Sequence, residues 1–311
     1  MEYRIYKFDF ITGVHLGEDS LEDGGFTLHA DTLFSALCQE CLKQGHKKLE
    51  RLVARTREGK IRLTDAFPCM EHTCYLPKPM LKIETEEKQG DSTLKKAYKK
   101  LSYIPADRLK DYIAGKLDVM QELNRFQENL GYGEVKTSAA VRGLEETMPY
   151  RVGIYHFHPG SGLYIIAGGE TGEDIRLLET GLESLELSGI GGKRTAGLGR
   201  FRLIQEKVPE DLKPCLEARE SSVSMALSVC LPKEDELEEV LEKASYLLLK
   251  RSGFVASDTY AKEHQKKRDL YVMQAGSCFG KRFEGDIYDV SAGGSHPVYR
   301  YAKPVFLEVV S

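Results

Sequence analysis

The first third of the chain carries one strand-like and one helix-like pattern of hydrophobic residues. Apolar and charged residues alternate from Glu2 to Phe10, which predicts a strand. A glycine-containing loop follows, and then LHADTLFSALCQECLKQG, whose apolar residues fall on one face of a helix: Leu33, Phe34, Leu37, Cys41 and Leu42. Asp31 stands where an N-cap is expected, and Gly45 stands where the helix should end.

The pattern then becomes irregular over a long segment. Short strands are predicted at Ile61–Leu63 and Thr73–Leu76. Residues 78–149 are polar and keep no steady period, so we interpret them as an insertion that is partly helical, at Asp107–Ala114 and Lys116–Glu128. A segment of this length is too long for a plain loop and should have a role of its own.

Regular patterns return after the insertion. Two alternating runs flank Pro159-Gly160-Ser161-Gly162, which predicts a hairpin. Glu173–Leu187 is an amphipathic helix, and a glycine-rich stretch then leads into a strand at Arg200–Gln205. The inward residues of the helix are Ile175, Leu178, Leu182 and Leu185. The order of elements is βαββαβ with one interruption, which is the ferredoxin-like arrangement.

The second half begins after a turn-rich linker at Pro209–Ser222. A strand at Val223–Leu231 and a helix at Glu234–Leu249 are predicted, and strand-like runs follow at Leu270–Gln274, Asp286–Val290 and Val298–Val310. We therefore expect an α+β protein with two domains, a ferredoxin-like first domain at residues 1–208 and a β-richer second domain of similar α+β kind at residues 209–311. The first would hold the insertion, and a glycine-rich loop would precede its last strand.

Composition restricts the class of protein. The 311 residues are 41% hydrophobic and 30% charged with mixed sign, which favours a folded chain. The net charge of −4 means that a nucleic-acid partner would need positive charge gathered in one groove. No apolar run approaches the ~20 residues of a membrane span. The charged N-terminus is unlike a signal peptide, and the seven scattered cysteines favour a reduced, cytoplasmic protein.

The glycine-rich stretch SGIGGKRTAGLGRF, Ser188–Phe201, fits neither common phosphate-binding motif. A P-loop would need glycine at Leu187, and the dinucleotide fingerprint would need it at Arg194. Both of those motifs also run from strand to helix, whereas this stretch runs from helix to strand. Nucleotide hydrolysis and NAD binding are therefore not expected, and we predict no cofactor.

The same stretch is suited to contact with a polyanion. Glycine permits close approach and positive φ, consecutive free N–H groups bind anionic oxygens, and three cations lie nearby. The predicted contacts to an RNA backbone are Gly189, Gly191, Gly192, Lys193, Arg194, Thr195, Gly197, Gly199 and Arg200. The other interpretation is a tight, mobile connector with solvated charges.

Two further constellations have chemical interpretations. His15 and His29 bracket the first glycine-containing loop and could supply the base and acid of a metal-independent ribonuclease, or His29 could be structural or donate to RNA. A zinc site can also be drawn from scattered ligands, namely Cys38, Cys41, Cys69, His72 and Cys74. The first two lie within a helical pattern, where cysteine behaves as a small hydrophobe, so we predict no metal.

Four segments together resemble a known family. They are LHADTLFSALCQECL, the glycine-rich stretch, KRSGFVAS at Lys250–Ser257, and GGSHPVYRYAKP at Gly293–Pro304. Over most of its length the chain resembles the fourth, RAMP-type subunit of the Csm series in type III-A CRISPR effector complexes. The glycine-rich loop is common to many RAMP proteins, and the paired end motifs favour this subunit.

The resemblance implies a fold, a role and partners. It implies two ferredoxin-like modules, a glycine-rich loop on guide-RNA phosphates and an insertion that acts as a thumb against the RNA. The implied partners are the 5′ handle of the crRNA, the Cas10-type large subunit and the backbone RAMP subunits, and the subunit is non-catalytic in this family. The alternatives are a crRNA-processing endoribonuclease of the same superfamily and a purely structural subunit.

Further RNA contacts are predicted near the C-terminus. Lys250 and Arg251 could grip phosphate or form a charged turn. Tyr299 and Arg300 place an aromatic beside a cation, as in single-stranded RNA recognition, although an ordinary strand with an outward arginine also explains them. Asp31 could resemble the target-cleaving aspartate of backbone subunits, but an N-cap accounts for it fully.

Overall fold

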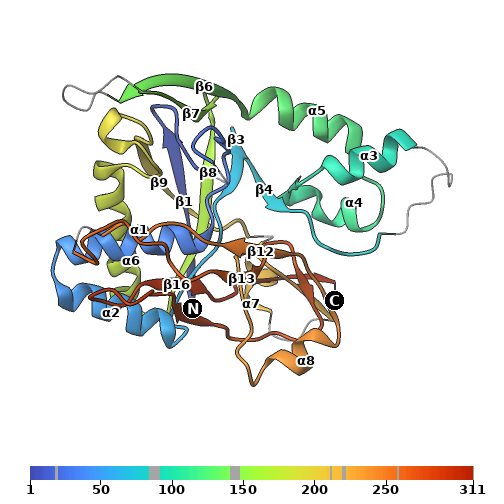
Figure 1. Ribbon diagram of the computed structural model, residues 1–311. Coiled ribbons are helices and arrows are strands. Elements are labelled where there is room, and N and C mark those ends of the chain that lie inside the picture. Colours follow the sequence, from blue (N-terminus) through green and yellow to red (C-terminus); the bar gives the residue numbers. More distant parts are fainter. Residues whose placement is uncertain are drawn as a thin grey trace.

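The computed structural model describes residues 1–17, 20–83, 92–140, 148–210, 212–218, 222–257 and 259–310. The protein is mixed α/β with antiparallel sheets (Figure 1). The main sheet has seven strands in the order β5-β4-β3-β8-β1-β9, and β2 also pairs with β8. Their bounds are β1 Glu2–Phe10, β2 Ile61–Leu63, β3 Phe67–Met70, β4 Thr73–Pro77, β5 Tyr103–Pro105, β8 Ser161–Gly169 and β9 Phe201–Lys207.

The main sheet is covered on both faces. Tyr6 and Phe8 of β1 belong to a core cluster shared with the helices, whereas Ile5 packs with Met225 and Leu307 of the C-terminal half. Every residue of β8 is buried for the same reason. The strand predicted at the N-terminus is confirmed, and its two sides are both apolar where they meet these cores.

Three helices cover one face: α1 (Ala30–Lys43), α2 (His46–Arg57) and α6 (Gly172–Ser188). The amphipathic pattern that predicted α6 is confirmed, because all four expected inward residues are buried. Its first turn is closed by a capping box in which Thr171 and Asp174 bond each other's backbone N–H groups. The sequence interpretation missed α2, whose stretch HKKLERLVARTR buries only Leu52, Val53 and Thr56.

The insertion forms a helical group and an arm. The helical group holds α3 (Ser92–Lys100), α4 (Leu109–Ile113) and α5 (Val119–Asn129), so the two predicted helices exist in shorter form. β6 (Gly131–Ala140) continues from α5 and pairs with β7 (Met148–Phe157), and this arm crosses the top of the molecule in Figure 1. Residues 84–91 and 141–147 of the predicted insertion lie outside the described residues.

The predicted hairpin around Pro159-Gly160 is wrong. The chain does turn there, because the Ser161 N–H donates to the His158 carbonyl (2.9 Å). However, the described part of β7 pairs with β6, and β8 pairs with β1, β2 and β3. The fully buried β8 enters the main sheet, and this tertiary placement overrides the local turn signal.

The C-terminal half is built from short elements. A sheet in the order β11-β14-β10-β17 is joined by the pairs β12-β13 and β15-β16. The bounds are α7 Lys213–Glu217, β10 Val223–Ala226, α8 Leu237–Leu241, β11 Ala244–Ser245, β12 Leu248–Arg251, β13 Leu270–Met273, β14 Cys278–Phe279, β15 Asp286–Asp289, β16 Tyr299–Ala302 and β17 Phe306–Val310.

Three predictions for this half need correction. The helix predicted to run to Leu249 ends at Leu241, and its remainder supplies β11 and β12. The strand predicted to run to Leu231 ends at Ala226. The last predicted strand is divided into β16 and β17 around Pro304, which has no N–H to donate to a ladder.

The two halves share one core. The Tyr301 hydroxyl donates to the Leu63 carbonyl (3.1 Å) and accepts from the Leu63 N–H (3.0 Å). The Arg62 Nη1 donates to the Pro304 carbonyl (2.7 Å). These bonds tie the second half to β2, and β16 packs beside α1 (Figure 1).

Within the described ranges, no helix is long and apolar enough to cross a membrane.

Candidate nucleic-acid interface

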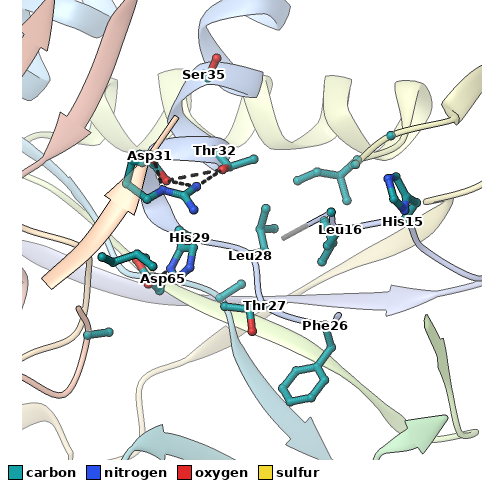
Figure 2. A pocket seen from close by; sticks show the side chains of 18 of the residues that line it. His15, Leu16, Phe26, Thr27, Leu28, His29, Asp31, Thr32, Ser35 and Asp65 are labelled. Atoms are coloured by element: carbon teal, nitrogen blue, oxygen red, sulfur yellow. Dashed lines mark hydrogen bonds and ion pairs between the residues drawn. The ribbon is translucent and has the colours of Figure 1, made fainter. Parts of the chain in front are cut away.

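A groove of 1360 Å³ runs between the two halves. The glycine-rich loop lines one part with Gly189–Gly192 and Arg194, and the C-terminal strands line another with Lys250, Arg251, Tyr299 and Arg300. α1 and α5 supply further walls. Figure 2 shows Asp31 and Thr32 on one side of this groove and His15 on the other. The fold therefore brings together most of the regions that the sequence singled out.

The glycine-rich loop is clamped onto the loop after β1. The Gly192 N–H donates to the His15 carbonyl (2.9 Å), and the Gly199 N–H donates to the Gly13 carbonyl (2.9 Å). A Cβ on Gly199 would lie 1.8 Å from the Ile190 carbonyl oxygen, and one on Gly191 would lie 2.5 Å from the His15 carbonyl oxygen. These glycines therefore serve close packing within the protein.

The tip of the loop remains open. Lys193 takes positive φ (57°), Arg194–Ala196 form one 3₁₀ turn, and Gly197 ends it with φ of 86°. In the described chain, the backbone N–H groups of Lys193, Arg194 and Thr195 donate to no other group. Consecutive free N–H groups in such a turn bind anions. The tip can therefore accept a phosphate oxygen.

The loop's three cations lie at different places. The Lys193 Nζ lies 4.5 Å from the ring centroid of Tyr150 on β7. Arg194 is exposed and reaches back to the Gly189 carbonyl (3.4 Å). Arg200 is also exposed. Only Arg194 of these three belongs to the groove wall, whereas Lys193, Arg200 and the residues Thr195, Gly197 and Gly199 lie outside it.

The prediction of Asp31 as an N-cap is wrong. His29 occupies the N-cap position of α1 without a side-chain cap bond, and the Ala30 N–H donates to Asp65 (2.9 Å). The Asp31 carboxylate instead accepts two hydrogen bonds from Arg251 (2.9 Å each) and one from Arg300. Two arginines brought by the second half are stronger partners for a carboxylate than one backbone N–H.

Asp31, Arg251 and Arg300 form an ion cluster that is largely buried, and the two arginines determine the pKa of the carboxyl group. Burial alone would raise the pKa of the Asp31 carboxyl, but Arg251 and then Arg300 outweigh it, and the pKa falls to about 2. Arg300 is only 4% exposed, so the interpretation with an outward arginine is wrong. Arg251 keeps a fifth of its side chain exposed in the groove wall.

The remaining predicted contacts of the second half lie at the groove's edge. Lys250 is exposed and pairs with Asp269 (2.7 Å). Tyr299 is half-buried, and its ring centroid lies 5.9 Å from the Arg57 guanidinium carbon. Both residues line the groove.

The two histidines line the groove but do not face each other. The Nδ1 of His29 lies 2.6 Å from the Asp65 carboxylate, and the His15 Nδ1–H donates to the Gly153 carbonyl (2.7 Å). Leu28 and Leu16 lie between the two imidazoles in the view of Figure 2. Each ring is held by its own structural partner, and the pair is not arranged as a joint acid and base.

Sequence analysis missed two parts of the wall. The polar residues Thr32, Ser35 and Gln39 line the groove from α1. Their i, i+3, i+7 spacing opposite the apolar stripe was the available signal. The aromatic wall is made by Phe26, Tyr103 and Phe126, and the last two rings stack with centroids 5.7 Å apart. No local pattern indicated that these rings would meet.

The cysteines proposed as metal ligands are free thiols, buried or half-buried within helices and strands. Cys41 is buried in α1, and Cys69 faces Cys74 across β3 and β4. Burial raises the pKa of the Cys69 thiol to about 12, so it stays protonated. Among the described residues, no group of three or more His, Cys, Asp or Glu side chains is arranged to hold a metal.

Comparison with known proteins gives matches over the whole chain. The RAMP superfamily model matches residues 7–202, and the model of the CRISPR Csm4 C-terminal domain matches residues 219–309. The protein named CRISPR system Cms protein Csm4 of Mycobacterium tuberculosis (strain ATCC 25618 / H37Rv) is 41% identical, over 99% of this chain and 98% of its own. The protein of that name from Streptococcus thermophilus is 34% identical, over 99% of each chain.

Solved structures share the fold. The match to a crystal structure of a Csm3–Csm4 subcomplex of the type III-A CRISPR-Cas interference complex has a TM-score of 0.69 at 19% identity and covers 98% of each chain. A Csm1–Csm4 cassette in complex with cA4 matches with a TM-score of 0.60 at 18% identity, over 99% of this chain and 98% of that one. The chain therefore belongs to the Csm4 family of CRISPR proteins, within the RAMP superfamily.

Proposed function

We propose that this chain is a non-catalytic, RNA-binding and scaffolding subunit of a type III-A CRISPR effector complex. It holds the 5′ handle of the crRNA and bridges the Cas10-type large subunit to the backbone RAMP subunits. The observation that carries the proposal is the groove. It joins the wall of the glycine-rich loop to Arg251, Arg300 and Tyr299 of the second half.

The architecture supports two ferredoxin-like units, residues 1–208 and 209–311. The order β9-β1-β8-β3 places the fourth, first, third and second strands of the expected motif side by side. The order β17-β10-β14-β11 repeats this sequence of strands in the second half. There α8 follows the first strand, and the β15-β16 pair stands where the second helix would be in the described chain.

The groove has the chemistry that single-stranded RNA requires. Such RNA is bound by backbone contacts and by stacking of bases on aromatic rings, at about 1–3 kcal/mol per base. The open N–H groups at 193–195 offer the first, and the ring cluster of Phe26, Tyr103 and Phe126 offers apolar surface for the second. α5 of the insertion supplies part of this wall, which supports the thumb-like role.

The scaffolding part of the proposal comes from relatives. Solved structures that share this fold include a Csm3–Csm4 subcomplex and a Csm1–Csm4 cassette, and both matches cover nearly the whole of this chain. The non-catalytic part is supported by the separate structural bonds of His15 and His29.

The test is RNA retention by the assembled complex over a series of salt concentrations. Replacing Lys193 and Arg194 with alanine should weaken retention of handle RNA. It should also flatten the salt dependence by about 0.7 per lost phosphate contact. The matched control is the alanine pair at Lys47 and Lys48, exposed in α2 and outside the groove wall. Retention equal to that of the control would contradict the proposal.

A further inference from the structure

The buried ion cluster in the groove wall carries more positive than negative charge. Asp31 accepts from both Arg251 and Arg300, and Arg251 also donates to the Thr32 hydroxyl (2.9 Å). Lys267 lines the same wall, half-buried. Around this group, Lys250 is neutralised by Asp269. Asp31 is the carboxylate that pairs with Arg251 and Arg300 among the described residues, and Lys267 adds a third positive charge beside them.

The donors of the cluster are incompletely used. The Nε of Arg300 is buried and has no hydrogen-bond partner, although its Nη2 donates to the Ser252 carbonyl (3.2 Å). The ammonium group of Lys267 makes no hydrogen bond or ion pair within the described residues. Burial, and next the charge of Arg300, lowers the pKa of Lys267. The Asp31 carboxylate opposes this lowering but does not cancel it. An ammonium beside two guanidiniums that forms no ion pair of its own is stabilised when an anion arrives.

The next carboxylate cannot fill this role. Asp65 is engaged by His29 and accepts from the backbone N–H groups of Ala30 and Val229. The excess positive charge therefore remains directed to the groove. Asp31, with which the two arginines pair, lies across the groove from His15 (Figure 2), and the glycine-rich loop is clamped against His15.

We propose that Lys267, Arg251 and Arg300 form a phosphate-binding subsite, built on the Asp31 carboxylate, at the opposite side of the groove from the glycine-rich loop. The inference rests on the proposed RNA-binding function and adds a second anchoring point for the strand. Asp31 pre-orients the two guanidiniums, and Lys267 supplies a third cation that makes no ion pair of its own in the described chain. The phosphate is either a bridging group of the RNA or a terminal phosphate at its 5′ end, since both present the same oxyanion chemistry.

The key variant is Lys267→Met, which keeps the aliphatic stem and leaves the contacts of Asp31 intact. The matched control is Lys266→Met, because Lys266 is exposed, belongs to the same segment and lies outside the groove wall. In the first arm, inorganic phosphate is titrated into the RNA-free full-length chain at constant ionic strength. Loss of one charge-assisted contact should weaken binding about tenfold in Lys267→Met and leave Lys266→Met unchanged.

In the second arm, the assembled complex is loaded with handle RNA that carries either a 5′-hydroxyl or a 5′-phosphate. An equal loss of affinity in Lys267→Met for both RNAs identifies a bridging phosphate. A loss confined to the phosphorylated RNA identifies a terminal one. Behaviour of Lys267→Met identical to that of Lys266→Met in both arms overturns the inference.

The two proposals can fail separately. If the Lys193 and Arg194 variant loses RNA while Lys267→Met does not, the subsite is wrong and the RNA-binding function stands. If Lys267→Met loses inorganic phosphate while no groove variant affects RNA, the subsite stands and the RNA-binding function is wrong.

Discussion

Replacing Asp31 with asparagine should destabilise the protein strongly, although the two side chains have nearly the same shape. The change removes the only carboxylate in direct contact with both Arg251 and Arg300 in the described chain, and Arg300 is almost fully buried. Breaking a buried ion pair from one side costs about 3–5 kcal/mol. The pKa of Asp31 gives an independent lower figure, because a fall from 3.8 to about 2 corresponds to about 2 kcal/mol. We expect a loss of about 2–5 kcal/mol in the free energy of unfolding at pH 7.

The assay is urea denaturation of the full-length chain, followed by far-UV circular dichroism. Asp235→Asn is the control, because Asp235 is an exposed aspartate in the same chain. The pKa of Asp31 is depressed in the folded state, so its contribution is complete above the unfolded value near 3.8 and disappears as the pH falls towards 2. The stability difference between wild type and Asp31→Asn should therefore shrink across that window. A loss of stability below about 1 kcal/mol, or one equal to that of Asp235→Asn, would refute the argument that the ion pairs of Asp31 with Arg251 and Arg300 hold the two halves together.

Two other predictions concern the loop and the histidines. Gly199→Ala and Gly197→Ala both place a side chain at positive φ, which costs about 1–2 kcal/mol of stability. Only Gly199→Ala also drives a Cβ against the Ile190 carbonyl oxygen, so it should cost a further ~1–3 kcal/mol in the same denaturation assay. Equal losses of stability in the two variants would contradict the clamped geometry. Repeat RNA incubated with the purified chain in EDTA should stay intact, as judged on a denaturing gel; specific cleavage that His29→Ala or His15→Ala abolishes would instead support an endoribonuclease.

The elements that the sequence predicted well are those with strong local periodicity. β1 and α6 carry enough alternating or amphipathic residues to be recognised alone, and both are confirmed. α2 was missed because its apolar stripe is short and most of its other residues are charged. The helix is stabilised by packing against α1.

The features that escaped prediction depend on contacts between distant residues. The turn after β7 was predicted to join two paired strands of a hairpin. Instead β7 pairs with β6, and β8 pairs with strands of the main sheet. Asp31 satisfied the local rule for an N-cap, but it forms ion pairs with two arginines that come from the second half of the chain. The glycine-rich loop was recognised as special, yet the clamp on Gly13 and His15 has no signal in a single sequence.

A structure of the assembled complex with its guide RNA is the most direct test of the account. We predict that phosphate oxygens of the 5′ handle lie about 3 Å from the backbone N–H groups of Lys193, Arg194 or Thr195, at hydrogen-bond distance. The strand should continue along the groove towards Arg251 and Lys267. A glycine-rich loop covered by a neighbouring protein subunit, with the handle bound elsewhere, would contradict it.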